Sequence, residues 1–239
     1  MLKPAAIVAL LLAAGQPGRA GETLTYDIRA GGFRFGELSV AWEPGETAYG
    51  VEVTASARGL FGLLTRARYS GRSEGAMDGR RPVPALFTAR SKRIFKAREA
   101  EVRFSDGVPA KVIMRPERDR TFMSEPSRVS APVIDPLTYL GQVTRRVAPE
   151  CPPRQALYDG RRQTSIGFGP AEGGAGGFTC KGAYEIVQGP SHSLQPRARR
   201  FGLELRYAPR KDGGFRLVRV LFLSGGSEVR LDLLAGPGG

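Results

Sequence analysis

Hydrophobic and polar residues alternate along most of this chain. Leu24, Tyr26 and Ile28 fall on one face of a two-residue repeat, which is the period of a β-strand with one buried face. Glycine- or proline-rich turns follow such segments, so an antiparallel, mainly β fold is predicted. The predicted strands are 24–30, 35–43, 49–55, 66–74, 85–93, 98–104, 111–114, 156–158, 163–168, 178–187, 201–207, 215–223 and 228–234.

One segment departs clearly from this pattern and predicts a helix over residues 135–147. Asp135 can cap the helix and Pro136 suits its first turn. One face is apolar, and two arginines would complement the dipole at the C-terminal end. The apolar face would consist of Leu137, Leu140, Val143 or Thr144, and Val147, followed by the basic pair Arg145 and Arg146.

Three further segments are expected to be irregular. Residues 58–65 are short, apolar and interrupted by glycine, so they predict a single turn or a loop. Such a loop would either plug one end of the sheet or form an apolar flap over a ligand cavity. Residues 115–132 predict a long exposed connection, and residues 169–177 predict a flexible glycine-rich connector.

The N-terminus is typical of a secretory signal. Residues 1–20 combine a basic start, an apolar stretch and small residues at Gly18 and Ala20, which predicts cleavage after Ala20. The apolar stretch is shorter than the roughly 20 residues that span a bilayer. We therefore expect a signal peptide at 1–20, a single β-rich domain at 21–239 and a periplasmic location if the source is Gram-negative.

Two cysteines, Cys151 and Cys180, lie outside the predicted signal. An oxidising compartment favours a disulfide between them, and two buried free thiols are the alternative. The pair is not a CxxC motif, so a thioredoxin-like redox site is disfavoured. With only one histidine in the chain, no zinc or other metal site and no cofactor is expected.

The net charge of +13 indicates an anionic partner. The basic residues are scattered in pairs without the interleaved aromatic residues that nucleic-acid surfaces use, and export makes nucleic acid a remote partner. Lipid, a lipoprotein or an anionic membrane surface fits better. The pair Arg161-Arg162 follows a predicted Asp159-Gly160 turn and is expected to be solvated, the alternative being a grip on an anionic group.

Candidate catalytic residues are few. His192 lies in a turn-rich loop beside Ser191 and Ser193, and adjacent residues rarely attain the geometry of a nucleophile and its base. Asp135 could serve as an acid, but its position before Pro136 explains it as a helix cap. No enzymatic activity is therefore expected, with a hydrolase as the less favoured alternative.

Several short motifs carry a resemblance to a known family. Asp135-Pro-Leu, Leu157-Tyr-Asp-Gly-Arg-Arg and the Cys180 strand, together with Leu24-Thr-Tyr-Asp-Ile and Pro84-Ala-Leu-Phe, resemble the exported bacterial family of domain of unknown function 3108. The resemblance is expected from about Leu24 to Leu234. It implies a fold similar to envelope lipoprotein carriers: a curved antiparallel sheet, or half-open β-barrel, with one helix packed in or against the concavity.

These expectations combine into a functional hypothesis. The protein would be a non-enzymatic periplasmic protein that binds or carries a hydrophobic or amphipathic envelope component. A structural or interaction protein of the envelope without a small ligand is the alternative. The candidate ligand-binding residues are Trp42, Leu60, Phe61, Leu63, Leu64 and Tyr139.

Overall fold

The fold is an antiparallel sheet that curves back on itself. A computed structural model describes residues 21–130, 132–191, 198–224 and 226–235, apart from the side chains of Leu60, Phe61 and Ala235. Within these residues, 15 strands belong to one sheet, whose main path runs β7-β6-β5-β4-β3-β2-β1-β15-β14-β13-β12-β10-β9. The mainly β, curved antiparallel fold predicted from the sequence is confirmed.

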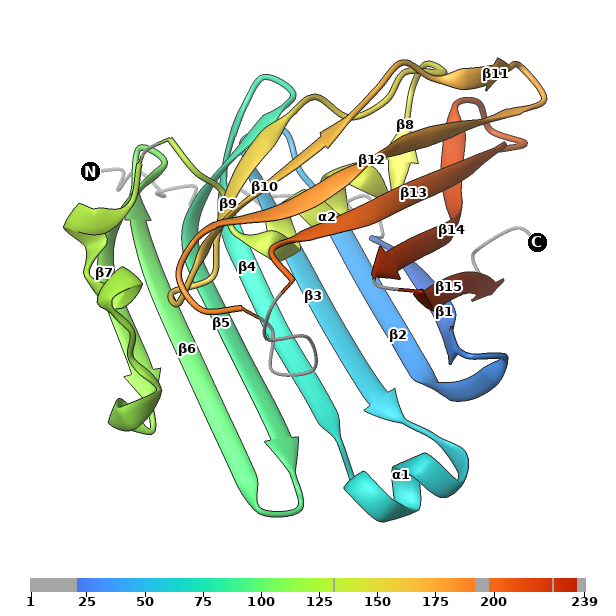
Figure 1. Ribbon diagram of the computed structural model, residues 1–239. Coiled ribbons are helices and arrows are strands. Elements are labelled where there is room, and N and C mark those ends of the chain that lie inside the picture. Colours follow the sequence, from blue (N-terminus) through green and yellow to red (C-terminus); the bar gives the residue numbers. More distant parts are fainter. Residues whose placement is uncertain (1–20, 131, 192–197, 225, 236–239) are drawn as a thin grey trace, which may run out of the picture.

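The first half of the chain forms a seven-strand meander (Figure 1). Each strand pairs antiparallel with the next, and Asp106 and Gly107 adopt the positive φ angles expected of the β6–β7 hairpin. The elements are β1 (Glu22–Ala30), β2 (Phe33–Pro44), β3 (Ala48–Ala57), α1 (Gly59–Thr65), β4 (Arg68–Asp78), β5 (Arg81–Arg93), β6 (Lys96–Ser105) and β7 (Val108–Arg115).

The second half begins with three 3₁₀ turns and a helix and then returns to strands. Its last strand pairs with the first strand of the chain, Tyr26 opposite Leu233, which joins the two halves into one sheet. The elements are η1 (Glu117–Asp119), η2 (Phe122–Ser124), η3 (Pro126–Arg128), α2 (Pro136–Val143), β8 (Arg145–Arg146), β9 (Gln155–Tyr158), β10 (Gln163–Phe168), β11 (Glu172–Gly174), β12 (Gly177–Gln188), β13 (Arg200–Pro209), β14 (Phe215–Ser224) and β15 (Ser227–Ala235).

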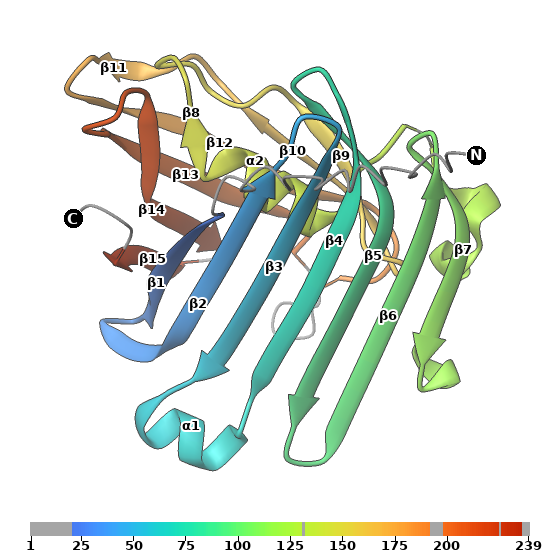
Figure 2. The ribbon, with the colours of Figure 1, turned by 180° about the vertical axis from the view of Figure 1, so that it is seen from behind.

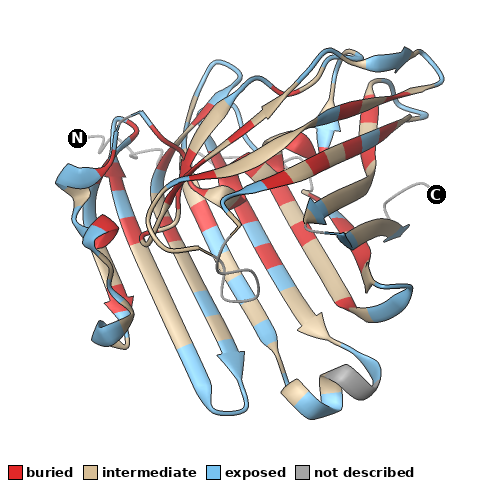
Figure 3. Cartoon of the chain, viewed as in Figure 1, coloured by how far each residue is buried: buried red, intermediate tan, exposed pale blue. Residues whose placement is uncertain are grey.

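Helix α2 lies between the two halves of the sheet (Figures 1 and 2). Leu137 belongs to the apolar core built on β1–β7, Tyr139 and Val143 belong to the core built on β9–β14, and Leu140 contacts both. Buried residues concentrate where the halves overlap, whereas the ends of β3–β6 near α1 are largely exposed or half-buried (Figure 3). The helix therefore holds the two halves together.

A buried polar network fixes the start of α2. The Asp135 carboxylate caps the helix by accepting hydrogen bonds from the backbone N–H groups of Leu137 and Thr138, at 2.9 and 3.0 Å. Its second oxygen accepts from the Ser73 and Thr138 hydroxyls, at 2.7 and 2.6 Å. Tyr49 joins through its hydroxyl, 2.7 Å from that of Thr138. The network confirms Asp135 as a cap and attaches α2 to β3 and β4.

The disulfide between Cys151 and Cys180 is confirmed. Their Cα atoms are 5.6 Å apart, and the bridge joins the segment after β8 to strand β12. Both cysteines contact the second core, with Cys180 fully buried.

Helix α2 is shorter than predicted. Thr144 ends it, because its hydroxyl donates to the Gly141 carbonyl at 2.7 Å and the next two residues leave as β8 to pair with β14. Val147 is consequently exposed and does not extend the apolar face. Arg145 forms an ion pair with Glu22, and the last turn of α2 contains no basic residue. The prediction that basic side chains complement the helix dipole is therefore wrong.

Three irregular segments are more ordered than expected. Residues 59–65 form the α-helix α1, although a single turn or loop was predicted. The 115–132 connection is not simply exposed, because the side chain of Met123 is fully buried in its 3₁₀ turns. Within 169–177, β11 pairs with β12.

Candidate ligand-binding cavity

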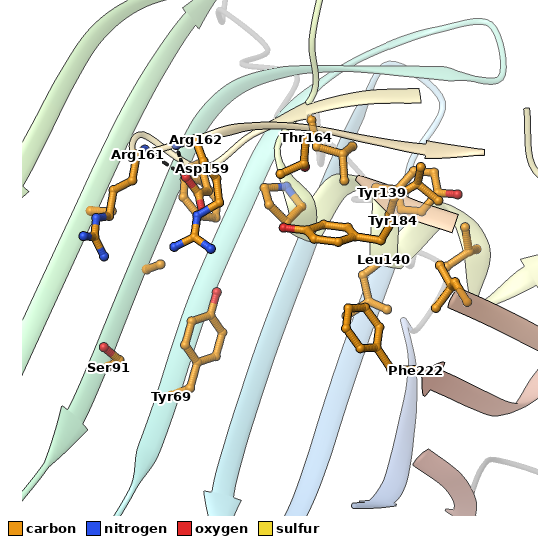
Figure 4. Close-up of a pocket in the computed structure, with 18 of the residues that line it drawn as sticks. Tyr69, Ser91, Tyr139, Leu140, Asp159, Arg161, Arg162, Thr164, Tyr184 and Phe222 are labelled. Atoms are coloured by element: carbon orange, nitrogen blue, oxygen red, sulfur yellow. Dashed lines mark hydrogen bonds and ion pairs between the residues drawn. The ribbon is translucent and has the colours of Figure 1, made fainter. Parts of the chain in front are cut away.

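A cavity of about 570 Å³ lies between the two halves of the sheet, beside α2 (Figure 4). This size falls in the roughly 300–1,000 Å³ range of small-molecule sites. One wall is the inner face of β4–β7, the opposite wall is formed by β9, β10 and β12–β14, and α2 closes the space between them. Its apolar lining includes Phe87, Met114, Leu140, Leu157, Leu205, Leu217, Val220 and Phe222.

Small residues on β5 and β6 create the hollow. Along β5 the inward positions pass from Phe87, which is buried, to Ala89 and Ser91, which line the cavity. Along β6 the inward position after buried Val102 is Ala100, opposite Ala89 across the strand pair. The side chains of the second half therefore do not meet a filled surface here, and space remains.

Polar groups gather at one end of the cavity, around the Asp159-Gly160 turn. The Asp159 carboxylate accepts hydrogen bonds from the backbone N–H groups of Arg161 and Arg162, both at 2.8 Å, and Gly160 supplies the positive φ of 85°. Both consecutive arginines therefore line the cavity, and Figure 4 shows their guanidinium groups turned away from the turn and toward the first half-sheet.

The two arginines differ in their partners. Arg162 forms an ion pair with Asp159 at 3.3 Å and a hydrogen bond with Tyr184. The pKa of Tyr184 is raised, because the effect of burial exceeds the opposing effect of the Arg162 charge. Arg161 is half-buried, and its Nε has no hydrogen-bond partner among the described residues. Burial, then the charges of Arg98 and Arg162, lower the Arg161 pKa. Arg161 is thus a desolvated cation facing the cavity without a bound acceptor at Nε.

The surrounding charges leave an excess of positive charge. Arg98, on the inner face of β6, forms an ion pair with Asp119 at 2.6 Å. Glu99 borders the cavity but pairs with Arg90 at 2.6 Å. Three arginines, at 98, 161 and 162, therefore face two aspartates, at 119 and 159. A single anionic group would balance them.

Tyr69 adds a hydroxyl near this end. Figure 4 shows its ring on the β4 wall with the hydroxyl directed toward the Asp159–Arg162 turn. Its pKa is raised, because burial disfavours the phenolate and because Asp135 and Asp159 are negatively charged. At neutral pH it is a protonated hydrogen-bond donor at the polar end of the cavity.

The structure brings only one of the predicted ligand-binding residues with a described side chain to this cavity. Tyr139 lines it from α2. Trp42 lies in the core under α2, and Leu63 and Leu64 are exposed on α1, so these three are not part of the lining. The side chains of Leu60 and Phe61, like His192 and the signal at 1–20, lie outside the part that the structure describes.

The sequence favoured solvated side chains for Arg161 and Arg162, whereas the structure places both in the cavity lining. Two features of the sequence could have indicated the site. Small residues at 89, 91 and 100 interrupt inward positions otherwise filled by Phe87, Val102 and Phe104. The Asp-Gly turn places two adjacent cations directly before a strand, but which surface they face depends on the opposite half of the sheet.

In the described residues, no three His, Cys, Asp or Glu side chains come together as metal ligands would. None of their helices has the length and apolar character needed to span a bilayer.

The fold and cavity define this protein as an antiparallel β half-barrel with a largely apolar pocket between its halves. Residues 25–170 match the family described as "Protein of unknown function (DUF3108)". Because this match covers more than half of the chain, the protein belongs to that family. The match ends at residue 170, whereas we expected the resemblance to continue to about Leu234.

A solved structure is similar at a lower level. It is described as a β-barrel-like protein of domain of unknown function DUF1849 from Brucella abortus. The identity is 10%, the similarity covers 91% of this chain and 97% of that chain, and the TM-score is 0.41. No curated protein matches the sequence.

Proposed function

We propose that this protein is a non-enzymatic binding protein that holds an amphipathic molecule in the cavity between its two half-sheets. The apolar part of the ligand occupies the space lined by Leu140, Leu205 and Phe222. Its anionic head lies against Arg161. The observation that carries this proposal is the half-buried Arg161, whose Nε has no hydrogen-bond partner in the described part of the chain, at one end of an otherwise largely apolar cavity.

Such a ligand would remove two free-energy costs of the empty cavity. Apolar surface facing an open cavity contacts water, and burying it contributes about 25 cal/mol per Å². The half-buried Arg161 is partly desolvated and its Nε has no acceptor among the described residues, and a charged hydrogen bond contributes about 1.5–3 kcal/mol. A molecule with an apolar chain and one carboxylate or phosphate satisfies both.

We further propose that this binding takes place in the periplasm, with a lipid or lipoprotein-derived molecule as the ligand. The predicted signal at 1–20 and the disulfide support an exported location, since disulfides persist in oxidising compartments. The net charge of +13 supports an anionic ligand.

Native mass spectrometry of protein purified without detergent tests the proposal. We expect adducts with the mass of an amphipathic lipid, lost on organic extraction. The variant Ser91→Phe, which puts a large side chain in the cavity lining, should carry no adduct. The matched variant Ser70→Phe, on the exposed outer face of the neighbouring strand β4, should keep it. Unliganded wild-type protein from several preparations, combined with no uptake of added dodecanoate, would overturn the proposal.

A further inference from the structure

Five large apolar side chains are exposed at one end of the first half-sheet. They are Phe33 (74% exposed), Leu63 (76%), Leu64 (66%), Ile94 (44%) and Phe95 (94%). They belong to the β1–β2 turn, to α1 between β3 and β4, and to the β5–β6 hairpin. Because consecutive strands run in opposite directions, these three connections share one end of the sheet, the lower end in Figures 1 and 2.

Backbone hydrogen bonds join these connections into one surface. The Arg58 N–H, at the start of α1, donates to the Phe35 carbonyl of β2 at 2.9 Å. The Ile94 N–H of the β5–β6 hairpin donates to the Thr65 carbonyl at the end of α1, at 3.2 Å. We call this surface, formed by residues 31–35, 58–68 and 92–96, the apolar rim.

The apolar rim is also strongly basic. Residues 53–73 and 79–98 contain no aspartate or glutamate. The exposed cations of the rim that form no ion pair with a described acidic residue are Arg66, Arg68, Lys92, Arg93 and Lys96. By contrast, the turns at the opposite end of the same strands mix both signs, with Glu46, Asp78 and Asp106 beside Arg80 and Arg81.

We propose that the apolar rim binds the surface of a bilayer that contains anionic lipids. Exposed phenylalanine and leucine side chains gain free energy by entering the boundary between headgroups and acyl chains, and adjacent cations gain it from the negative surface potential. Five large apolar side chains exposed on adjacent connections mark an interaction site, and the neighbouring cations, which have no acidic residues among them, indicate that its partner is anionic. Membrane binding at the apolar rim is a separate property from ligand binding in the cavity and does not depend on it.

The position of the rim relates it to the cavity. The β5–β6 hairpin that carries Phe95 at its tip also carries Ser91 and Arg98, which pair across the two strands and line the cavity. A bilayer bound at the rim would therefore lie on the side of the cavity that these two residues form.

A tryptophan placed on the rim tests the contact directly. The chain has one tryptophan, Trp42, which is buried, so Phe95→Trp adds an exposed reporter. With vesicles of phosphatidylcholine and phosphatidylglycerol, we expect a blue shift of its emission and quenching by brominated acyl chains. Phe122→Trp, at an exposed phenylalanine in the 3₁₀ turns, is the matched control and should show neither. Equal quenching at both positions, or at neither, would overturn the proposal.

A charge-matched pair of variants tests the electrostatic part. Replacing Lys92, Arg93 and Lys96 with glutamine should lower partitioning onto the same vesicles about a hundredfold at low salt. Replacing Arg80, Arg81 and Lys111, which are exposed toward the opposite end, removes the same charge and should change partitioning far less. Equal losses for the two triple variants, or wild-type protein that does not bind these vesicles at low salt, would contradict the proposal.

Discussion

The ring of Trp42 lies directly against the Cα of Gly141, so that a Cβ built on Gly141 would come within 2.3 Å of Trp42 Cε3. Helix α2 can approach β2 this closely only because position 141 has no side chain. The contact explains why Trp42, which we expected to bind ligand, instead belongs to the core that positions α2.

Gly141→Ala should therefore destabilise the protein. The added methyl group overlaps an aromatic ring held on a strand, and relieving the overlap requires a shift of α2 or of Trp42. We expect the free energy of unfolding to fall by about 1–3 kcal/mol, measured by urea denaturation. Gly176→Ala, where a Cβ meets no atom within 4 Å, is the control. An unchanged midpoint for Gly141→Ala would show that the helix is not closely packed on β2.

Asp135→Ala should lower the free energy of unfolding more than Gly141→Ala does. It removes a helix cap and leaves the Ser73 and Thr138 hydroxyls without their buried acceptor, which together cost about 2–4 kcal/mol. Asp135→Asn keeps an oxygen for the Leu137 and Thr138 N–H groups and should cost clearly less. Asp78→Asn, on an exposed turn, is the control for losing one negative charge.

The same carboxyl group predicts a pH dependence. Burial raises the Asp135 pKa above its ordinary value of 3.8, although the hydrogen bonds from Thr138, Ser73 and Leu137 oppose this shift. The folded state then binds the proton more tightly than the unfolded state. Relative to Asp135→Asn, the wild type should lose stability as pH rises from the ordinary value to the raised one, and the difference should level off above it. A difference that grows in favour of the wild type over this interval would contradict the raised pKa.

Arg161→Gln should change ligand preference and leave the fold intact. Because the Arg161 Nε has no partner in the described part of the chain, its loss removes no intramolecular hydrogen bond at that atom. We expect dodecanoate affinity to fall by about tenfold or more, as the loss of a charged hydrogen bond implies, and dodecanol affinity to stay unchanged. Arg80→Gln, on the exposed β4–β5 turn, should alter neither. Equal losses for the two ligands would mean that Arg161 does not recognise the anionic head.

The strands were predictable because burial of one face produces a two-residue alternation within each strand's own sequence. Tyr26, Val40 and Val53 alternate with small or polar neighbours, and the structure buries all three. Helix α2 was predictable for the same reason, since Asp135 and Pro136 carry a local signal for its start. Its end was not, because the pairing of Arg146 with Phe215 of β14 is a contact between distant parts of the chain.

The cavity depends on such distant contacts almost entirely. Ala89 on β5 and Leu205 on β13 line the same space only because β15 pairs with β1 and brings the second half over the first. Nothing near Arg161 in the sequence indicates Arg98, whose charge lowers the Arg161 pKa. Sequence alone could indicate missing volume on the inner face, but not what lies opposite to it.

The claim that this cavity binds an amphipathic anion can be tested by calorimetric titration of delipidated protein with dodecanoate. We predict saturable binding to the wild type and to Ser70→Phe, with an affinity at least tenfold weaker in Ser91→Phe while its circular dichroism stays unchanged. Equal affinity in Ser91→Phe and Ser70→Phe, or no saturable binding to any of the three proteins, would contradict the claim.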